Sequence, residues 1–537
     1  MLPHESPTPP RARFAGLDGL RAIAVTLVVV YHLFPGSWLR GGFIGVDVFF
    51  VISGFLITSL LLRERTDTGR IGLLGFWQRR ARRLLPALGL LLVTCASAAW
   101  LIGGDVLVGL GRQLLGAGTF SYNWLSVSGG ADYFGANGSE LFRNLWSLAV
   151  EEQFYLVWPL LLLLLLLLPR TWMRVAVVAV LGAGSAVWMA TLVLSGGGSP
   201  ETLGAEITRV YFGTDTHAFG LLLGVAVALV WRVVTGRERE WMQRRAVRVT
   251  VLMVGIAALV GLAVVAGLPQ EQSVATFPGA LLGASALTAV AIVAGCWPGA
   301  WFGRAIDVAP LRWVGDRSYG LYLWHWPVLV LLVAATQRTG TDRPFPLWVG
   351  VAALAIALAA TEVSYRLLET PVRRLGFRET LGAVVRALRG PGPHRPLAWV
   401  AVTASAALVA GTVAGVAVAP SVSSGEAVVE AGMAALHDRE PLSPASGPGI
   451  TGDQITAVGD SVMLASAPGL LERYPGIQID AAVSRSMYAA PGILRDLEPR
   501  AGCDRSWSSP SAPTERCRRA PSTGSSTQSV PSASSSW

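Results

Sequence analysis

The chain has 537 residues, of which 52% are hydrophobic and 14% are charged, and its mean hydropathy is +0.51. Soluble domains carry about 25% charged residues, so the composition excludes a soluble globular protein and indicates a membrane protein with many spans. The formal net charge is +9, and the sequence contains no lysine. The arginines gather in short loops between apolar runs, as the positive-inside rule predicts. That distribution argues against a nucleic-acid partner.

Eleven apolar segments are long enough to cross a bilayer. They lie near residues 17–35, 42–62, 84–104, 150–168, 174–195, 212–234, 247–267, 277–297, 317–337, 346–366 and 396–420. The expected fold is therefore an all-α polytopic membrane protein, with about ten transmembrane helices plus one linking helix at about 396–420. Alternate loops are rich in arginine, which predicts a cytoplasmic N-terminus and an extracytoplasmic C-terminus.

The first two spans carry ionisable residues that lipid would reject. Arg21 and His32 lie eleven positions apart in the first span, which places them on one helical face about 16 Å apart. Asp47 begins the second span, close in depth to His32. Such residues usually face a bundle interior or a water-filled cavity and mark a site. Ser53 and Gly54, further along the second span, are expected to permit close helix packing.

Further polar residues converge in depth on the outer side. Glu151 and Glu152 are expected at the outer mouth of the fourth span, Asp215 begins the sixth, and His325 lies in the middle of the ninth. The arginine run 79–83 belongs to the loop on the inner side. This distribution predicts a site through which a substrate crosses the membrane.

After Pro420 the chain becomes a polar linker, and residues 451–500 then read as a strand, a GDS turn, a helix and a second strand. This pattern begins an α/β domain that is not completed. Residues 501–537 form a Ser/Pro/Arg-rich tail that predicts disorder, and we hypothesise a frameshift or premature end. The expected membrane domain is 14–370. Residues 371–450 are expected to form a cytoplasmic loop, the linking helix and a linker, and they are followed by the α/β segment 451–500 and the tail 501–537.

Six motifs occur in an order that resembles one known family. They are FAGLDGLRAIAVTLVVVYH, GVDVFFVISGFLIT, RRARRLLP, NLWSLAVEEQFYLVWP, SYGLYLWHWPVL and LLETPVRR. Together they resemble the acyltransferase-3 family of integral membrane O-acyltransferases, which includes bacterial O-antigen and peptidoglycan O-acetyltransferases. The segment that follows resembles the fused extracytoplasmic SGNH hydrolase-like domain of many members. The resemblance implies ten spans plus one linking span, in agreement with the hydropathy pattern.

His32 is the expected general base, because an imidazole titrates near neutral pH and can take a proton from a hydroxyl. An acid beside it would fix its tautomer, as in a catalytic triad. Asp47 and Glu151 are both candidates, and the sequence does not choose between them.

The resemblance implies that Arg80 and Arg83 hold the phosphates of an acyl-CoA donor, expected to be acetyl-CoA from the cytoplasm, with Arg21 along its entry path. Membrane topology alone would also explain the charge of this run. Asp215 and His325 are further candidates for substrate binding. A helix–helix hydrogen bond is the alternative role of His325.

Ser461 of the GDS turn is placed as the SGNH nucleophile would be. No histidine follows it in the sequence to serve as its base, so we expect this segment to be inactive. No metal site and no bound cofactor are expected.

The expected function is a multi-pass acyltransferase of the bacterial cell membrane, moving an acyl group from acyl-CoA to a hydroxyl of an extracytoplasmic carbohydrate. A transporter or proton-coupled carrier and a decayed, inactive homologue are the alternatives.

Overall fold

The computed structural model describes residues 14–129, 140–195, 204–235, 240–268, 274–337, 341, 345–390, 392, 395–437 and 455–482. The chain divides into two compact units, Met1–Ser424 and Gly425–Trp537. The long helices of the first unit are α1 (Leu17–Leu33), α2 (Gly45–Thr68), α3 (Leu73–Ile102), α6 (Leu145–Leu165), α7 (Thr171–Ser195), α10 (Phe219–Thr235), α11 (Arg245–Gly267), α12 (Gly279–Cys296), α14 (Ala309–Gln337), α15 (Leu347–Ser364) and α18 (Arg395–Ala417).

Shorter helical segments connect the long helices. They are η1 (Gly42–Ile44), η2 (Gly104–Leu107), α4 (Leu110–Gly118), α5 (Tyr122–Ser128), α8 (Gly204–Phe212), α9 (Thr214–His217), η3 (Glu240–Gln243), η4 (Val274–Thr276), α13 (Trp301–Ile306), η5 (Tyr365–Glu369), α16 (Thr370–Leu375) and α17 (Phe377–Arg389). η5 is a π-helical turn that joins α15 to α16.

Ten helices in the described part of the chain are long and apolar enough to cross a membrane. α1 has 17 residues, or about 26 Å at the helical rise, slightly less than a bilayer core. Each of the eleven predicted spans overlaps α1 or one of these ten, so the expected all-α polytopic membrane fold is confirmed. Three boundaries were placed too late, because α3 begins at Leu73, α6 at Leu145 and α14 at Ala309. The arginine run 79–83 therefore lies within a helix and not in a loop.

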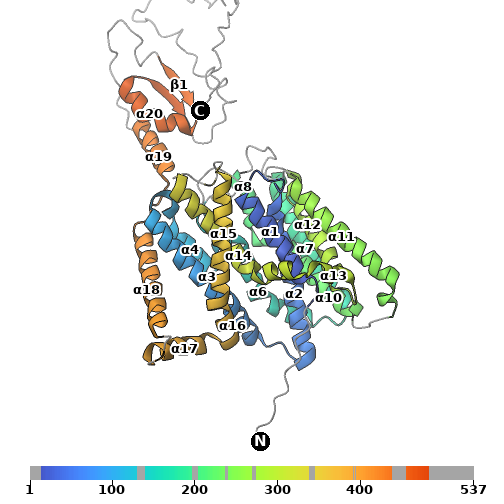
Figure 1. Cartoon of the computed structure of the whole chain (residues 1–537). Helices are drawn as coiled ribbons and strands as arrows, with labels where there is room; N and C mark the ends of the chain where they lie inside the picture. The colour runs from blue at the N-terminus through green and yellow to red at the C-terminus, as the bar shows by residue number, and fades with distance from the viewer. Residues whose placement is uncertain are drawn as a thin grey trace, which may run out of the picture. The chain divides into compact units, whose positions relative to one another are not determined.

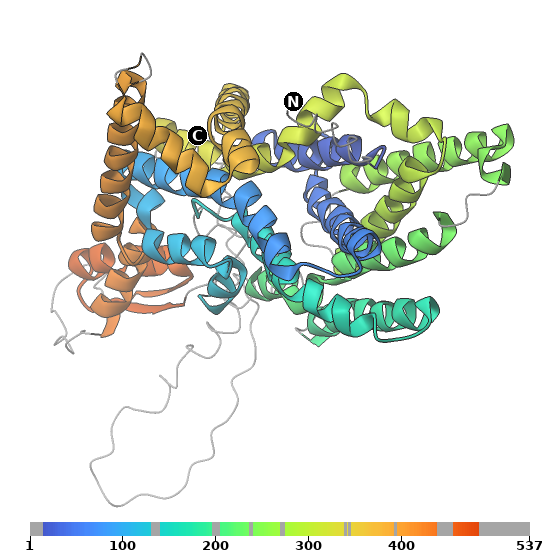
Figure 2. The same cartoon turned by 90° about the horizontal axis from the view of Figure 1, so that it is seen from below.

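The helix bundle is built around α1, which packs mainly against α14 and α2 (Figure 1). The views in Figures 1 and 2 place α18 and α11 at opposite edges of this bundle. α18 lies against α3, and α11 lies against α12. The helix that carries Arg21 and His32 is therefore surrounded by other helices.

A carboxylate from another segment holds the start of α1 in place. The backbone N–H groups of Gly16 and Gly19 donate to the two carboxylate oxygens of Asp307, at 2.7 and 2.9 Å. The first N–H groups of a helix have no partner within it, and a carboxylate at this end also suits the helix dipole. Asp307 therefore fixes the start of the helix that carries Arg21 and His32.

Two glycines let α2 and α10 approach each other closely. A Cβ added at Gly54 would lie 1.9 Å from the carbonyl oxygen of Leu221, and one at Gly224 would lie 2.1 Å from that of Val51. Each helix thus contributes a glycine where the other helix's backbone passes, as expected for small residues at a helix interface. The prediction of close packing is confirmed for Gly54, whereas Ser53 has a different role.

The second unit contains α19 (Ser424–His437) except for its first residue, and β1 (Thr456–Gly459), α20 (Ser461–Arg473) and β2 (Gln478–Ala481). β1 and β2 pair in parallel, with Thr456 opposite Gln478. The predicted order of strand, GDS turn, helix and strand is thus confirmed. The end of the predicted 451–500 segment, from residue 483, and the expected frameshifted and disordered tail at 501–537 lie outside the described residues.

Candidate active site

One cavity brings together the three arginines that the sequence singled out. Its walls include Arg21 of α1, Arg80 and Arg83 of α3 and Glu151 of α6, and its empty volume is about 720 Å³. Three guanidinium groups face one carboxylate, so the wall carries an excess of positive charge. Guanidinium groups suit the paired oxygens of a phosphate or carboxylate. The other walls include Val46, Phe49, Phe50, Ile52, Leu56, Leu84, Leu148, Tyr155, Tyr319 and Tyr322.

Stacking on an aromatic ring orients Arg80 in the cavity. Its guanidinium carbon lies 4.1 Å from the centre of the Tyr155 ring, a cation–π contact. The Tyr155 carbonyl accepts a hydrogen bond from Trp77 Nε1 at 3.2 Å. Pro159, four residues later, has no N–H to offer that carbonyl, so the Trp77 indole takes its place. Arg80 is therefore held in position before any ligand binds.

Glu151 lies deeper than the sequence suggested. It was expected at the mouth of its span beside His32, but α6 begins six residues earlier at Leu145, which carries Glu151 about 9 Å along the helix. There it accepts a hydrogen bond from Ser53 Oγ at 2.5 Å and faces the arginines. The structure thus groups Glu151 with Arg21, Arg80 and Arg83.

His32 instead pairs with a second imidazole. Its Nδ1 lies 3.2 Å from Nε2 of His325, and the two rings are 5.2 Å apart. His325 is fully buried on α14, and its Nδ1 lies 2.8 Å from the Tyr322 carbonyl oxygen and 3.2 Å from that of Leu321. The structure therefore brings together two predicted residues that are 293 positions apart.

Pro327 shapes the helix turn that holds His325. It lies inside α14 and offers no N–H to the Leu323 carbonyl, four residues before it. The side chain of Asn144 fills this gap, because its Nδ2 donates to the carbonyls of Tyr322 and Leu323 at 2.8 and 3.3 Å. The carbonyl group that Pro327 leaves without a backbone donor is thereby used to link α14 to the start of α6.

Sequence reasoning missed several residues around His32. Trp326 lies edge-on to the imidazole at 4.9 Å, and the Arg143 guanidinium is 5.5 Å from the Trp326 ring. Trp326 Nε1 donates to the Glu140 carbonyl at 3.0 Å. Glu140 also accepts from the Tyr122 hydroxyl at 2.7 Å, and burial together with this carboxylate raises the pKa of Tyr122 well above its ordinary value. Trp326 stands directly after His325 in the HWP motif, which was the available signal.

Tyr322 connects the cavity to the histidine pair. It lines the cavity, and its ring lies 5.5 Å from that of His325. Its hydroxyl donates to the Asn144 carbonyl at 2.9 Å and lies 2.5 Å from Ser147 Oγ, a second cavity residue. The bonded side chains of Tyr322 and Ser147 thus lie between the cavity that they line and the ring of His325, which Tyr322 contacts.

Asp47 does not take the role proposed for it beside His32. Its Oδ1 lies 2.9 Å from Nε2 of His217, and both side chains are completely buried. The other ring nitrogen of His217 lies 2.8 Å from the Tyr211 carbonyl oxygen. The rings of Phe50, Trp146, Tyr211 and Phe219 surround this imidazole. A buried acid and base bonded to each other inside an aromatic shell are typical of a structural pair, so Asp47 is corrected as a candidate partner of His32.

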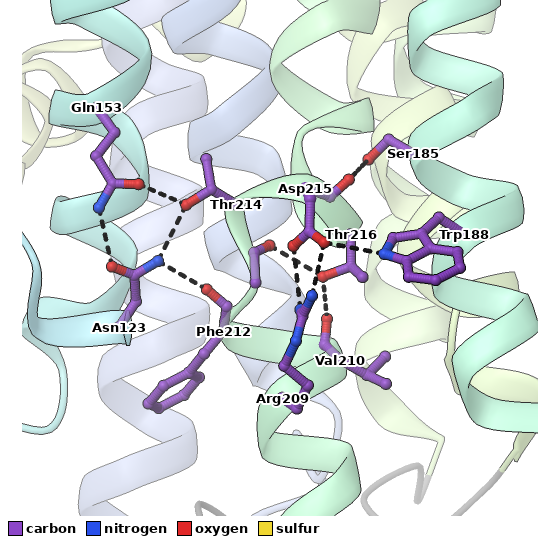
Figure 3. Close-up of polar contacts among 11 residues, drawn as sticks. Asn123, Gln153, Ser185, Trp188, Arg209, Val210, Phe212, Thr214, Asp215 and Thr216 are labelled. Atoms are coloured by element: carbon purple, nitrogen blue, oxygen red, sulfur yellow. Dashed lines mark hydrogen bonds and ion pairs between the residues drawn. The ribbon is translucent and has the colours of Figure 1, made fainter. Parts of the chain in front are cut away.

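Asp215 belongs to a separate polar network (Figure 3). Arg209 forms a forked ion pair with its carboxylate, at 3.0 and 2.6 Å, and Trp188 Nε1 donates to the same group at 2.9 Å. Ser185 Oγ donates to its backbone carbonyl. These contacts join α7, α8 and α9, and Asp215 is not among the residues that line the arginine cavity.

A second group in Figure 3 joins α5, α6 and α9. Gln153 donates to Asn123 Oδ1 at 3.0 Å and accepts from Thr214 Oγ1 at 2.6 Å. Asn123 Nδ2 donates in turn to Thr214 Oγ1 and to the Phe212 carbonyl, both at 3.0 Å. Every hydrogen-bonding group of the two amide side chains named here has a partner, so the network fixes helix positions.

Ser461 is the first residue of α20 in the second unit, directly after Asp460, whose side chain accepts from the Val462 N–H at 2.9 Å. Its expected inactivity stays a prediction. In the described ranges, no three His, Cys, Asp or Glu side chains lie together as a metal ion would require.

Comparison with known proteins identifies the family to which this chain belongs. Residues 14–362 match the family model described as "Acyltransferase domain". The chain belongs to this acyltransferase family. The chain is 35% identical over 367 residues to the peptidoglycan O-acetyltransferase OatA of Listeria monocytogenes, covering 67% of this chain and 56% of the relative. It is also 35% identical over 366 residues to the O-acetyltransferase OatA of Staphylococcus aureus, covering 68% of this chain and 58% of the relative.

The matches thus span little more than half the length of these relatives. No solved structure matches this chain. The family match covers the whole arginine cavity and both histidines of the pair, because Arg21 and His325 both lie within residues 14–362.

Proposed function

We propose that this protein transfers an acetyl group from an acyl-CoA donor to a hydroxyl of a cell-envelope or exported carbohydrate, with peptidoglycan as the acceptor suggested by the relatives. The observation that carries this proposal is the cavity in which Arg21, Arg80 and Arg83 face one carboxylate inside a bundle of membrane helices. Cationic groups at membrane depth mark a substrate path. A donor with several phosphates supplies the opposite charge in the form that guanidinium groups bind best.

The donor enters with its phosphates at the arginines and its pantetheine arm along the apolar and aromatic walls. Those walls include Tyr322, whose ring lies 5.5 Å from that of His325. The thioester must pass this point to reach His32. Tyr322 therefore marks the boundary between the donor cavity and the site of transfer.

His32 is the general base of the transfer. Its unprotonated ring nitrogen takes the proton of the acceptor hydroxyl while that oxygen attacks the thioester carbon. The bond between this carbon and the CoA sulfur then breaks, the sulfur leaves as a thiolate, and the proton held by His32 returns to it. An ester and free CoA are the products, so atoms and charge balance without any further reactant.

We place the N-terminus in the cytoplasm, since the loops on that side carry the arginine excess. In this orientation Arg21, in the second turn of α1, lies toward the cytoplasm, and His32, in its last turn, lies toward the outside. The donor is then taken up from the cytoplasm and the acceptor from outside. α1 spans the distance between them.

The test is to reconstitute the full chain in liposomes, offer acetyl-CoA labelled in the acetyl group, and supply a soluble peptidoglycan fragment. We expect free CoA and a labelled ester in equal amounts. A carrier without transferase activity would instead move label across the membrane and release no CoA. Absence of CoA release with every acceptor and with water would contradict the proposal. Mass spectrometry of envelope glycans with and without the gene would then identify the natural acceptor.

A further inference from the structure

The hydrogen bonds of His325 fix where its proton lies. Its Nδ1 is 2.8 Å from the carbonyl oxygen of Tyr322 and 3.2 Å from that of Leu321. A carbonyl oxygen only accepts, so Nδ1 carries a hydrogen. In a neutral imidazole the second nitrogen then carries the lone pair, so Nε2 of His325 is an acceptor.

A charged His325 does not fit its surroundings. The side chain is fully buried. In the described structure its ring contacts two carbonyls, the imidazole of His32 and the ring of Tyr322, and none of these is a carboxylate. A buried charge without a counter-ion is costly. The neutral form with hydrogen on Nδ1 is therefore the one that the geometry favours.

The state of His32 follows from that of His325. Nε2 of His325 lies 3.2 Å from Nδ1 of His32, and one of the two must donate. Because Nε2 of His325 accepts, Nδ1 of His32 carries the hydrogen, and the lone pair of His32 lies on its Nε2. We propose that His325 is a positioning residue that selects this tautomer and turns the basic Nε2 of His32 toward the acyl acceptor. The inference rests on the proposed role of His32 as base.

The proline of the HWP motif supports the arrangement. Asn144 satisfies the carbonyl that Pro327 leaves without a donor, and the same side chain reaches the Tyr322 carbonyl to which His325 donates. The His325 ring is thereby anchored to a turn that is itself held by α6. In a catalytic triad an aspartate orients the histidine and also stabilises its charged form. Here a neutral imidazole supplies the orientation alone.

Two substitutions separate positioning from structure. His325→Leu keeps a similar side-chain volume but removes the hydrogen bonds to the two backbone carbonyls and to His32. His325→Gln restores both kinds of bond, since its amide N–H can donate to the carbonyls and its amide oxygen can accept from His32. Thr336→Val, on an exposed turn of the same helix, is the matched control. Each variant is assayed as full chain in liposomes for kcat and for the KM of acetyl-CoA.

We expect His325→Leu to lower kcat about 100-fold, the scale of a misplaced catalytic group. The KM for acetyl-CoA should stay within about twofold, because His325 is not among the residues that line the donor cavity. His325→Gln should recover most of kcat, and Thr336→Val should match the wild type. If His325→Leu retains wild-type kcat, or if the Gln variant is as impaired as the Leu variant, the positioning role is wrong.

A spectroscopic measurement tests the same inference without any variant of His325. Nitrogen-15 NMR of labelled histidines in the wild-type membrane protein should show His32 protonated on Nδ1, with the assignment made by loss of the signal in His32→Ala. Protonation on Nε2 would overturn the proposal whatever the variants show. Activity of His32→Ala, measured alongside, reports separately on the proposed function, because full activity there would remove the base itself.

Discussion

Three arginine side chains line the cavity, and the loss of one should appear directly in the binding of the donor. A hydrogen bond that involves a charged group contributes about 1.5–3 kcal/mol. At about 1.4 kcal/mol for each factor of ten, Arg83→Ala should raise the KM for acetyl-CoA roughly 10- to 100-fold. Arg80→Ala should raise the KM by a similar factor, and this variant also loses the stacking on Tyr155. Arg80→Lys should recover only part of this loss, because an ammonium has neither the planar fork nor the same stacking.

Arg79 is the matched control for this experiment. It belongs to the same run, but its side chain is 56% exposed and pairs with Glu64 at 2.9 Å, and it is not among the cavity residues. Arg79→Ala should leave the KM within about twofold, as expected for an exposed ion pair. The assay is CoA release against acetyl-CoA concentration in liposomes. Equal effects of Arg79→Ala and Arg83→Ala, or a normal KM in the Arg80/Arg83 double variant, would refute donor binding at the cavity.

Two further predictions concern the frame that holds the site. Asp47→Ala should lower the free energy of unfolding by about 3–5 kcal/mol, the scale for removing one half of a buried pair, because His217 would lose its bond to this carboxylate. Asp47→Asn should lower it less. Equal melting temperatures of the two variants in detergent would contradict the pairing. Gly54→Val should prevent normal folding, since its Cβ would meet the Leu221 carbonyl oxygen, whereas Gly89→Val, with open space around it on α3, should express normally as judged by size-exclusion chromatography.

The fold was largely predictable because hydropathy and helix length depend on the local sequence. Each span was located, and the GDS segment was correctly read as strand, helix and strand. The starts of α3, α6 and α14 were missed, because polar and charged residues such as Arg79, Ser147 and Arg317 mask the beginning of a helix that extends beyond the apolar run. That error placed Glu151 at the wrong depth.

The partners within the site were predictable only in part. Spacing along one helix placed Arg21 and His32 on one face, and the depth argument brought His325 into consideration. Depth alone does not determine which helices are neighbours or how each is rotated. Asp47 was therefore kept as a candidate partner of His32 beside Glu151, although it lies against His217, the last residue of α9. The bond between His32 and His325 likewise depends on the packing of α1 on α14, which no local pattern reveals.

The most direct test of the account is the His32→Ala substitution in the reconstituted full chain, with acetyl-CoA as donor and a peptidoglycan fragment as acceptor. The variant should insert and elute as the wild type does and should bind acetyl-CoA with unchanged affinity, because His32 is not among the cavity residues. Acyl transfer should fall by about 100-fold or more, the usual contribution of a general base. Transfer at the wild-type rate by the correctly inserted variant would contradict the central claim.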